Sequence, residues 1–228
     1  MRVCTLICGV PRPSMADIYP PYQVLFEALL RPALPEATFG HTQAWDGELP
    51  ALEDYDAYVV TGSPATAFDR EPWMLALEDL VRRAAADDRK VIGICFGHQL
   101  AAQAFGGKVE RRGWGLGVRT ATTAKPGGLI DRADYAAIVS HQDQVTILPE
   151  DAEVLASSDF CPYEAMTVGR NVVSVQGHPE MTMAIAEALV HLRRDELDDA
   201  AYRRFIDSLA TSPHNADMGR WIGRFIRG

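Results

Sequence analysis

Short apolar segments alternate along the first hundred residues with longer segments whose apolar positions have helical spacing. Residues 57–61 (AYVVT) and 91–94 (VIGI) have the length and β-branched content typical of buried parallel strands. Residues 72–86 carry apolar side chains at helical spacing and are followed by a polar stretch. This order predicts a parallel sheet covered by helices. The same pattern predicts further strands at residues 2–8 and 37–43 and helices at residues 20–30 and 97–105.

Beyond residue 108 the pattern changes to short β-like segments separated by Gly, Pro and Asp, which favours antiparallel pairing. We expect strands at residues 116–122, 136–139, 153–157, 165–168 and 171–175, and helices at residues 181–193, 195–209 and 217–227. No internal repeat or low-complexity linker divides the chain. The sequence therefore predicts one domain, residues 1–228, with an α/β fold: an open, mostly parallel twisted sheet flanked by helices, with an antiparallel portion.

Composition and charge narrow the classes of partner. The formal net charge is −9, whereas binding to nucleic acid requires clustered Lys and Arg, so we expect no nucleic-acid partner. Four arginine pairs, at residues 82–83, 111–112, 193–194 and 203–204, are dispersed along the chain, and we expect them on the solvated surface. No apolar run approaches the ~18 residues of a membrane span, and no signal-peptide pattern opens the sequence. We expect a cytoplasmic protein without membrane association.

The four cysteines form neither a disulfide framework nor a paired CxxC metal pattern. We therefore expect free thiols, no metal site and no cofactor. Cys4 and Cys8 fall in the apolar first strand, and Cys161 lies beside a proline in a predicted loop. For these three, a buried structural role is the expectation.

The fourth cysteine has a different setting. Residues 91–100 (VIGICFGHQL) read as a strand, then Gly93-x-Cys95-x-Gly97, then a helix. This is the sulfur counterpart of the nucleophile elbow of hydrolases. The helix N-terminus favours a thiolate, and the backbone N–H of Phe96 points to where an oxyanion would form. A lone cysteine is more often structural, but the two glycines at this junction favour a nucleophile.

A thiol nucleophile requires a base, and the base requires an orienting group. Residues 172–180 (VVSVQGHPE) read as a strand that ends at Gly177, followed by His178, Pro179 and Glu180. The two-residue spacing can place the side chains of His178 and Glu180 on the same side of an extended segment. The alternative is that His-Pro-Glu only opens the next helix.

Together these segments resemble the class I (triad) glutamine amidotransferases. GICFGHQL is similar to the nucleophile segment of that family, and GHPE to its His–Glu segment. YVVTGSP, at residues 58–64, is similar to the strand and glycine loop that supplies the second oxyanion-hole amide. The resemblance extends in the family's order over about residues 54–181, and it implies the family's flavodoxin-like fold.

The resemblance also implies a role for each matching residue. Cys95 would attack the γ-carboxamide carbon of a glutaminyl group. His178 would protonate the leaving amine and then activate water, and Glu180 would orient His178. The backbone N–H groups of Gly62 and Phe96 would hold the oxyanion. The bound glutamyl group would be contacted by Gln99 and by a loop containing Ser140, His141 and Gln142, whereas His98 is expected to be structural.

Within the family, the segments are most similar to free-standing GMP synthase-like amidotransferases and γ-glutamyl peptidases. GMP synthase itself usually has Ser-His-Gly-Asp where residues 140–143 read Ser-His-Gln-Asp, and the chain has no room for its synthase domain. The resemblance implies Cys-dependent hydrolysis of the γ-glutamyl amide bond of a small molecule, either glutamine or a γ-glutamyl conjugate. We expect the Pro-rich and aromatic residues 10–22 to form an outer substrate pocket or a purely structural loop.

Three other functions remain open. One is a glutaminase subunit that supplies ammonia to a separate synthase, and another is a non-catalytic binding module on the same fold. The presence of all three triad residues disfavours the second. A dinucleotide-dependent oxidoreductase is weaker still, because the prolines of residues 8–13 (CGVPRP) do not fit a Gly-x-Gly-x-x-Gly turn.

Overall fold

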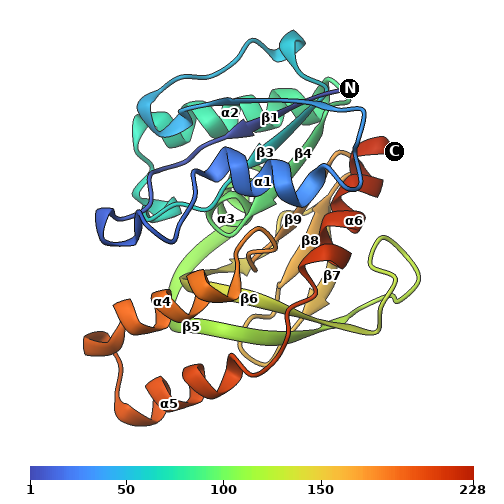
Figure 1. The fold of residues 1–228 in the computed structure, drawn as a ribbon. Helices are drawn as coiled ribbons and strands as arrows, with labels where there is room; N and C mark the ends of the chain where they lie inside the picture. The colour runs from blue at the N-terminus through green and yellow to red at the C-terminus, as the bar shows by residue number, and fades with distance from the viewer.

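Nine strands form a single mixed sheet in the computed structural model, which describes residues 1–228 (Figure 1). Five mutually parallel strands come first, in the spatial order β2 (Thr38–Thr42), β1 (Arg2–Leu6), β3 (Ala57–Val60), β4 (Lys90–Ile94) and β9 (Val172–Val175). Antiparallel strands continue the sheet, in the order β8 (Ala165–Val168), β7 (Ala152–Ser157), β5 (Lys108–Thr123) and β6 (Asp134–Ile147). The predicted α/β fold with an antiparallel portion is confirmed.

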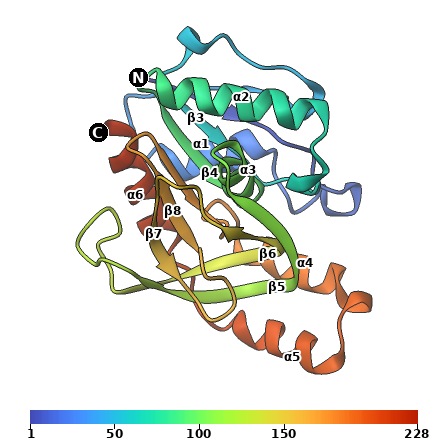
Figure 2. The ribbon, with the colours of Figure 1, turned by 180° about the vertical axis from the view of Figure 1, so that it is seen from behind.

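Helices cover both faces of the parallel half. Helices α1 (Tyr22–Leu30) and α6 (Asn215–Arg227) lie on one face, and α2 (Pro72–Ala86) and α3 (Phe96–Ala104) lie on the other (Figures 1 and 2). Helices α4 (Met183–Leu192) and α5 (Asp199–Ser208) pack against β5. None of the helices combines the length and hydrophobicity that crossing a bilayer requires.

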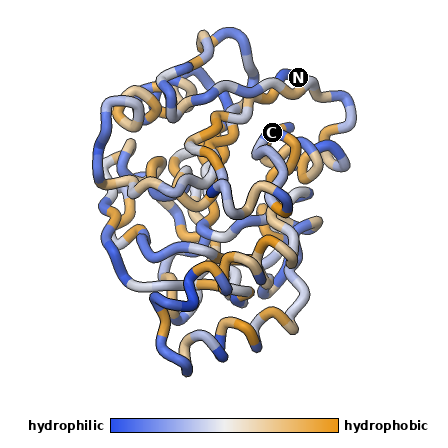
Figure 3. Tube along the Cα trace, turned by 60° about the vertical axis from the view of Figure 1, so that its left-hand side comes forward, coloured by the Kyte–Doolittle hydropathy of each residue, from blue (hydrophilic) through white to orange (hydrophobic).

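The two-residue period of the strands divides the core into two layers. Val3 of β1 belongs to the cluster that includes α1 and α6, whereas Cys4 and Leu6 of the same strand belong to the cluster that includes α2 and α3. In Figure 3 the strands in the middle of the molecule are mostly hydrophobic, whereas hydrophobic and hydrophilic residues alternate along the outer helices. Because both faces of these strands are buried, their sequences are almost continuously apolar.

The largest errors in the predicted boundaries concern β5, β6 and α5. Strands β5 and β6 are much longer than expected and form an antiparallel pair with an irregularity between Arg111 and Gly115. Residues 140–143, expected as a loop, therefore lie within β6. The helix expected from residue 195 begins at Asp199, where the side chain of Asp198 accepts a hydrogen bond from the Ala201 N–H at 2.7 Å. This cap fixes the start of α5.

Candidate active site

The carboxyl ends of three neighbouring strands meet at one edge of the sheet. Gly62 follows β3, Cys95 follows β4, and His178 follows β9, and these strands are adjacent in the order β3-β4-β9. In open α/β sheets, ligands bind outside the carboxyl ends of parallel strands. All three residues line one cavity of about 290 Å³. The topology therefore brings together segments that are far apart in the sequence.

Cys95 occupies a sharp turn between β4 and α3. Its backbone has φ +52° and ψ −101°, a conformation that costs a non-glycine residue about 1–3 kcal/mol. A Cβ on Gly93 would come within 2.5 Å of the Gly97 carbonyl oxygen, and a Cβ on Gly97 would overlap the Val60 carbonyl oxygen. Only glycine fits at either position, which explains the Gly-x-Cys-x-Gly pattern. The Cys95 N–H donates to the Val175 carbonyl at 2.9 Å and ties the turn to β9.

His178 and Glu180 form a buried pair beside this turn. The two atoms His178 Nδ1 and Glu180 Oε1 are 2.8 Å apart, and the Glu180 side chain is fully buried. The His178 N–H donates to the Ile138 carbonyl at 2.7 Å, so β6 holds the backbone of the pair in place. The two-residue spacing therefore places both side chains together, as the sequence predicted.

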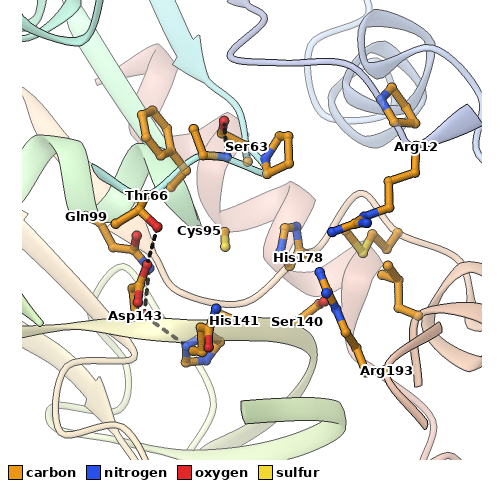
Figure 4. A pocket seen from close by; sticks show the side chains of 18 of the residues that line it. Arg12, Ser63, Thr66, Cys95, Gln99, Ser140, His141, Asp143, His178 and Arg193 are labelled. Carbon is orange, nitrogen blue, oxygen red and sulfur yellow. Dashed lines mark hydrogen bonds between the residues drawn. The ribbon is translucent and has the colours of Figure 1, made fainter. Parts of the chain in front are cut away.

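The imidazole of His178 also lies next to Cys95. A Cβ on Gly62 would be 2.9 Å from His178 Cε1 and 3.8 Å from Cys95 Cβ, so both side chains flank the same glycine. Figure 4 shows the side chains of Cys95 and His178 next to each other in the cavity. Burial by itself lowers the pKa of His178. The negative charges of Cys95 and Glu180, together with the hydrogen bond to Glu180, outweigh burial and raise that pKa to about 10. An imidazolium is the form that can protonate a leaving amine.

Two backbone amides near Cys95 are available as donors. Gly62 lies outside the helices and strands, and its N–H donates to no protein acceptor. Phe96 is the first residue of α3, so its N–H has no acceptor within the helix. Both residues line the cavity. Free N–H groups on either side of a nucleophile are suited to stabilising a developing oxyanion.

Polar side chains form the wall of the cavity nearest α3. Gln99 Nε2 donates to the Asp143 carbonyl at 2.7 Å and to Gln176 Oε1 at 3.2 Å. The carboxylate of Asp143 accepts hydrogen bonds from Thr66 Oγ1 at 3.1 Å and from Arg111 Nε at 3.0 Å. These bonds fix the polar wall before any ligand enters. The cavity lining also includes the other residues expected to contact substrate, Ser140, His141 and Gln142.

The remaining walls come from segments that sequence reasoning placed only in part. Residues of the 10–22 segment line the cavity, as the outer-pocket hypothesis predicted: Val10, Pro11, Arg12, Met15, Tyr19 and Tyr22. Arg111 and Arg193, expected on the solvated surface, also line it, and so does Trp114. Arg111 is exposed as expected, with 54% of its side chain accessible, whereas Arg193, at 19%, is largely covered because the end of α4 folds over the carboxyl edge of the sheet. A linear pattern of arginine pairs gives no indication of this.

The other buried histidines and thiols are in environments that disfavour their charged forms. Burial lowers the pKa of His98 and of His141 to about 3. His98 does not line the cavity, and its Nδ1 lies 2.8 Å from Ser174 Oγ. Burial raises the pKa of Cys4 and of Cys8 to about 12 and raises that of Cys161 as well. None of these three cysteines reaches the cavity.

The geometry agrees with the comparison to known families. The family model for glutamine amidotransferase class-I matches residues 33–191. The chain belongs to the class I glutamine amidotransferase family. Among its relatives, γ-glutamyl peptidase 5 of Arabidopsis thaliana is 35% identical, over 81% of this chain and 80% of that protein. Membership of this family and this relative together support an amide-hydrolysing function.

Solved structures of other amidotransferases share the fold. A glutamine amidotransferase from Thermotoga maritima superposes with a TM-score of 0.76 at 18% identity, over 100% of this chain and 98% of that one. Another glutamine amidotransferase, from Methylobacillus flagellatus, gives a TM-score of 0.75 at 21% identity, over 99% of this chain and 93% of that one. At these identities the likeness concerns the fold alone.

Proposed function

We propose that the chain hydrolyses the amide bond of a small γ-glutamyl compound by means of a Cys95–His178–Glu180 triad. The observation that carries the proposal is the cavity at the carboxyl edge of the sheet, where Cys95 lies beside the buried His178–Glu180 pair. A binding module would have no need for a cysteine in a strained turn next to an imidazole of raised pKa. These features favour catalysis over binding alone.

The reaction would have two stages. The Cys95 thiolate attacks the γ-carbonyl carbon, and the N–H groups of Gly62 and Phe96 stabilise the resulting oxyanion. The tetrahedral intermediate collapses as His178 donates its proton to the leaving nitrogen, which gives a free amine and a γ-glutamyl thioester. His178 then accepts a proton from water as the water attacks the thioester, which releases glutamate and restores the thiolate. Glu180 holds the imidazole in the required orientation throughout.

We propose further that the substrate is a γ-glutamyl conjugate in preference to glutamine and that no partner is required. The relative named γ-glutamyl peptidase 5 supports this preference. The cavity walls from residues 10–22 and from α4 provide room for a group larger than ammonia beyond the scissile bond. Contacts to that group would favour conjugates if they strengthen in the transition state.

The test is release of glutamate by the purified chain from glutamine, γ-glutamyl amines and γ-glutamyl dipeptides. We expect kcat/KM to be highest for conjugates, and we expect Cys95→Ala to abolish turnover while leaving the fold intact. Turnover of glutamine only after addition of a synthase would instead identify an ammonia-supplying protein. Full activity of Cys95→Ala would exclude the proposed chemistry.

A further inference from the structure

Two arginine side chains reach the cavity from opposite sides. Arg12 belongs to the segment after β1, and Arg193 follows the last residue of α4. Figure 4 shows both guanidinium groups near His178, on the side of Cys95 that is opposite to Gln99. The two arginines therefore lie at a different end of the cavity from the polar wall beside α3.

Arg193 is held in place but retains an unused donor. Its Nη1 donates to Glu196 Oε1 at 2.7 Å, and its guanidinium lies 4.4 Å from the centre of the Trp114 ring. Trp114 Nε1 donates to the same carboxylate at 3.1 Å. The Nε of Arg193 is buried and has no hydrogen-bond partner, although the side chain as a whole is 19% exposed. No ligand atom can reach the buried Nε, whereas Nη2 has no hydrogen-bond partner and is not buried, so Nη2 is the donor available to an added acceptor.

Arg12 adds a second cation at the same end. Its side chain forms no hydrogen bond or ion pair within the protein, and it lines the cavity. The hydrogen bond from Arg193 lowers the pKa of Glu196, and the charge of Arg12 adds to this effect, so the three groups share one electrostatic environment. The two guanidinium groups outnumber the one carboxylate, that of Glu196, with which Arg193 pairs. Arginine forks match the geometry of a carboxylate.

The position of His178 assigns this end to the leaving group. In the proposed reaction His178 donates a proton to the leaving nitrogen, so the amine portion must extend from the scissile bond past the imidazole. The arginines lie beside His178, whereas Gln99 lies on the other side of Cys95 (Figure 4). The glutamyl group and the leaving group would therefore occupy opposite ends of the cavity.

We propose that Arg12 and Arg193 bind a carboxylate carried by the leaving group. The preferred substrates are then γ-glutamyl amino acids or peptides, whose leaving group carries a free carboxylate, rather than γ-glutamyl derivatives of simple amines. This inference rests on the proposed γ-glutamyl hydrolysis and specifies its substrate class.

The test compares γ-glutamyl-alanine with γ-glutamyl-alaninamide, which differ in the charge of one terminal group. We expect the wild-type protein to have a higher kcat/KM for γ-glutamyl-alanine. In Arg193→Gln and in Arg12→Gln, we expect the ratio of the two kcat/KM values to fall about tenfold or more, the effect of losing one charge-assisted hydrogen bond. Use of a ratio cancels the intrinsic difference between the two leaving amines.

Arg194→Gln is the matched control, because Arg194 is the neighbouring residue and does not line the cavity. We expect it to keep the wild-type ratio. If Arg193→Gln and Arg12→Gln lower both activities equally, or if the wild-type protein hydrolyses both substrates equally well, the carboxylate site is excluded while γ-glutamyl hydrolysis stands. Hydrolysis of neither substrate by the wild-type protein would overturn the proposed function and this inference together. Thermal unfolding of each variant shows whether it is still folded. Because Arg12 lies in a different segment from Arg193, Arg12→Gln tests the carboxylate site even if Arg193→Gln fails to fold.

Discussion

Replacing Glu180 with Gln tests how the buried carboxylate acts on His178. The substitution keeps the size of the side chain but removes the negative charge 2.8 Å from Nδ1. A hydrogen bond to a charged group contributes about 1.5–3 kcal/mol and a neutral one about 0.5–1.5 kcal/mol, so the loss is about 1–1.5 kcal/mol. Since one pKa unit corresponds to about 1.4 kcal/mol, the pKa of His178 should fall by about one unit.

The sign of the effect on activity follows from the role of the imidazolium. His178 must be protonated to donate to the leaving amine, so kcat/KM declines as pH rises through its pKa, which is about 10. In Glu180→Gln that decline should begin about one pH unit lower. The assay is the pH profile of kcat/KM for a γ-glutamyl dipeptide, measured on both proteins.

Glu164→Gln serves as the control for loss of a buried carboxylate. Glu164 is buried, accepts a hydrogen bond from Ser158 Oγ at 2.7 Å and does not line the cavity. In this variant we expect kcat/KM to decline at the same alkaline pH as in the wild-type protein. If Glu180→Gln does not shift the pH of this decline, or if Glu164→Gln shifts it equally, the assigned role of Glu180 is wrong.

Three further outcomes are expected. Gly97→Ala should lower both stability and activity, since its Cβ would overlap the Val60 carbonyl; overpacking costs about 1–3 kcal/mol, which urea unfolding measures. The pKa of His98 is lowered from 6.5 to about 3 in the folded protein, so below pH 6.5 the unfolded chain binds more protons than the folded one. The free energy of unfolding therefore falls as the pH drops below 6.5. His98→Asn should reduce that loss by about 1.4 kcal/mol per pH unit, and an unchanged pH dependence would contradict the assignment. Iodoacetamide should modify Cys95 before the other three thiols, and peptide mapping would reveal any other order.

The parallel half of the fold could be predicted because its strands are buried on both faces and leave a nearly continuous apolar pattern. Helix α2 was predicted with the bounds it has, Pro72–Ala86. Only residues 136–139 of strand β6 were predicted, because the strand continues through five polar residues, 140–144 (SHQDQ), where it passes the cavity. Residues 140–143 therefore read as a loop although they pair with β5.

The candidate site divides in the same way. Cys95, His178 and Glu180 could be proposed as site residues because each follows a predicted strand, and the residues next to them in the sequence indicate their role. Arg111 and Arg193 could not, because their place at the cavity depends on how distant elements fold over the sheet edge. The part of the site that we expect to determine specificity is thus the part that only the tertiary structure revealed.

The central claim is that Cys95 carries the γ-glutamyl group during turnover. Acid-quenching the protein during hydrolysis of a γ-glutamyl dipeptide, followed by mass spectrometry of the intact chain and its peptides, tests this directly. We predict one γ-glutamyl adduct, located on the peptide that contains Cys95 and absent from Cys95→Ala. An adduct on another cysteine, or continued turnover by Cys95→Ala, would contradict the claim.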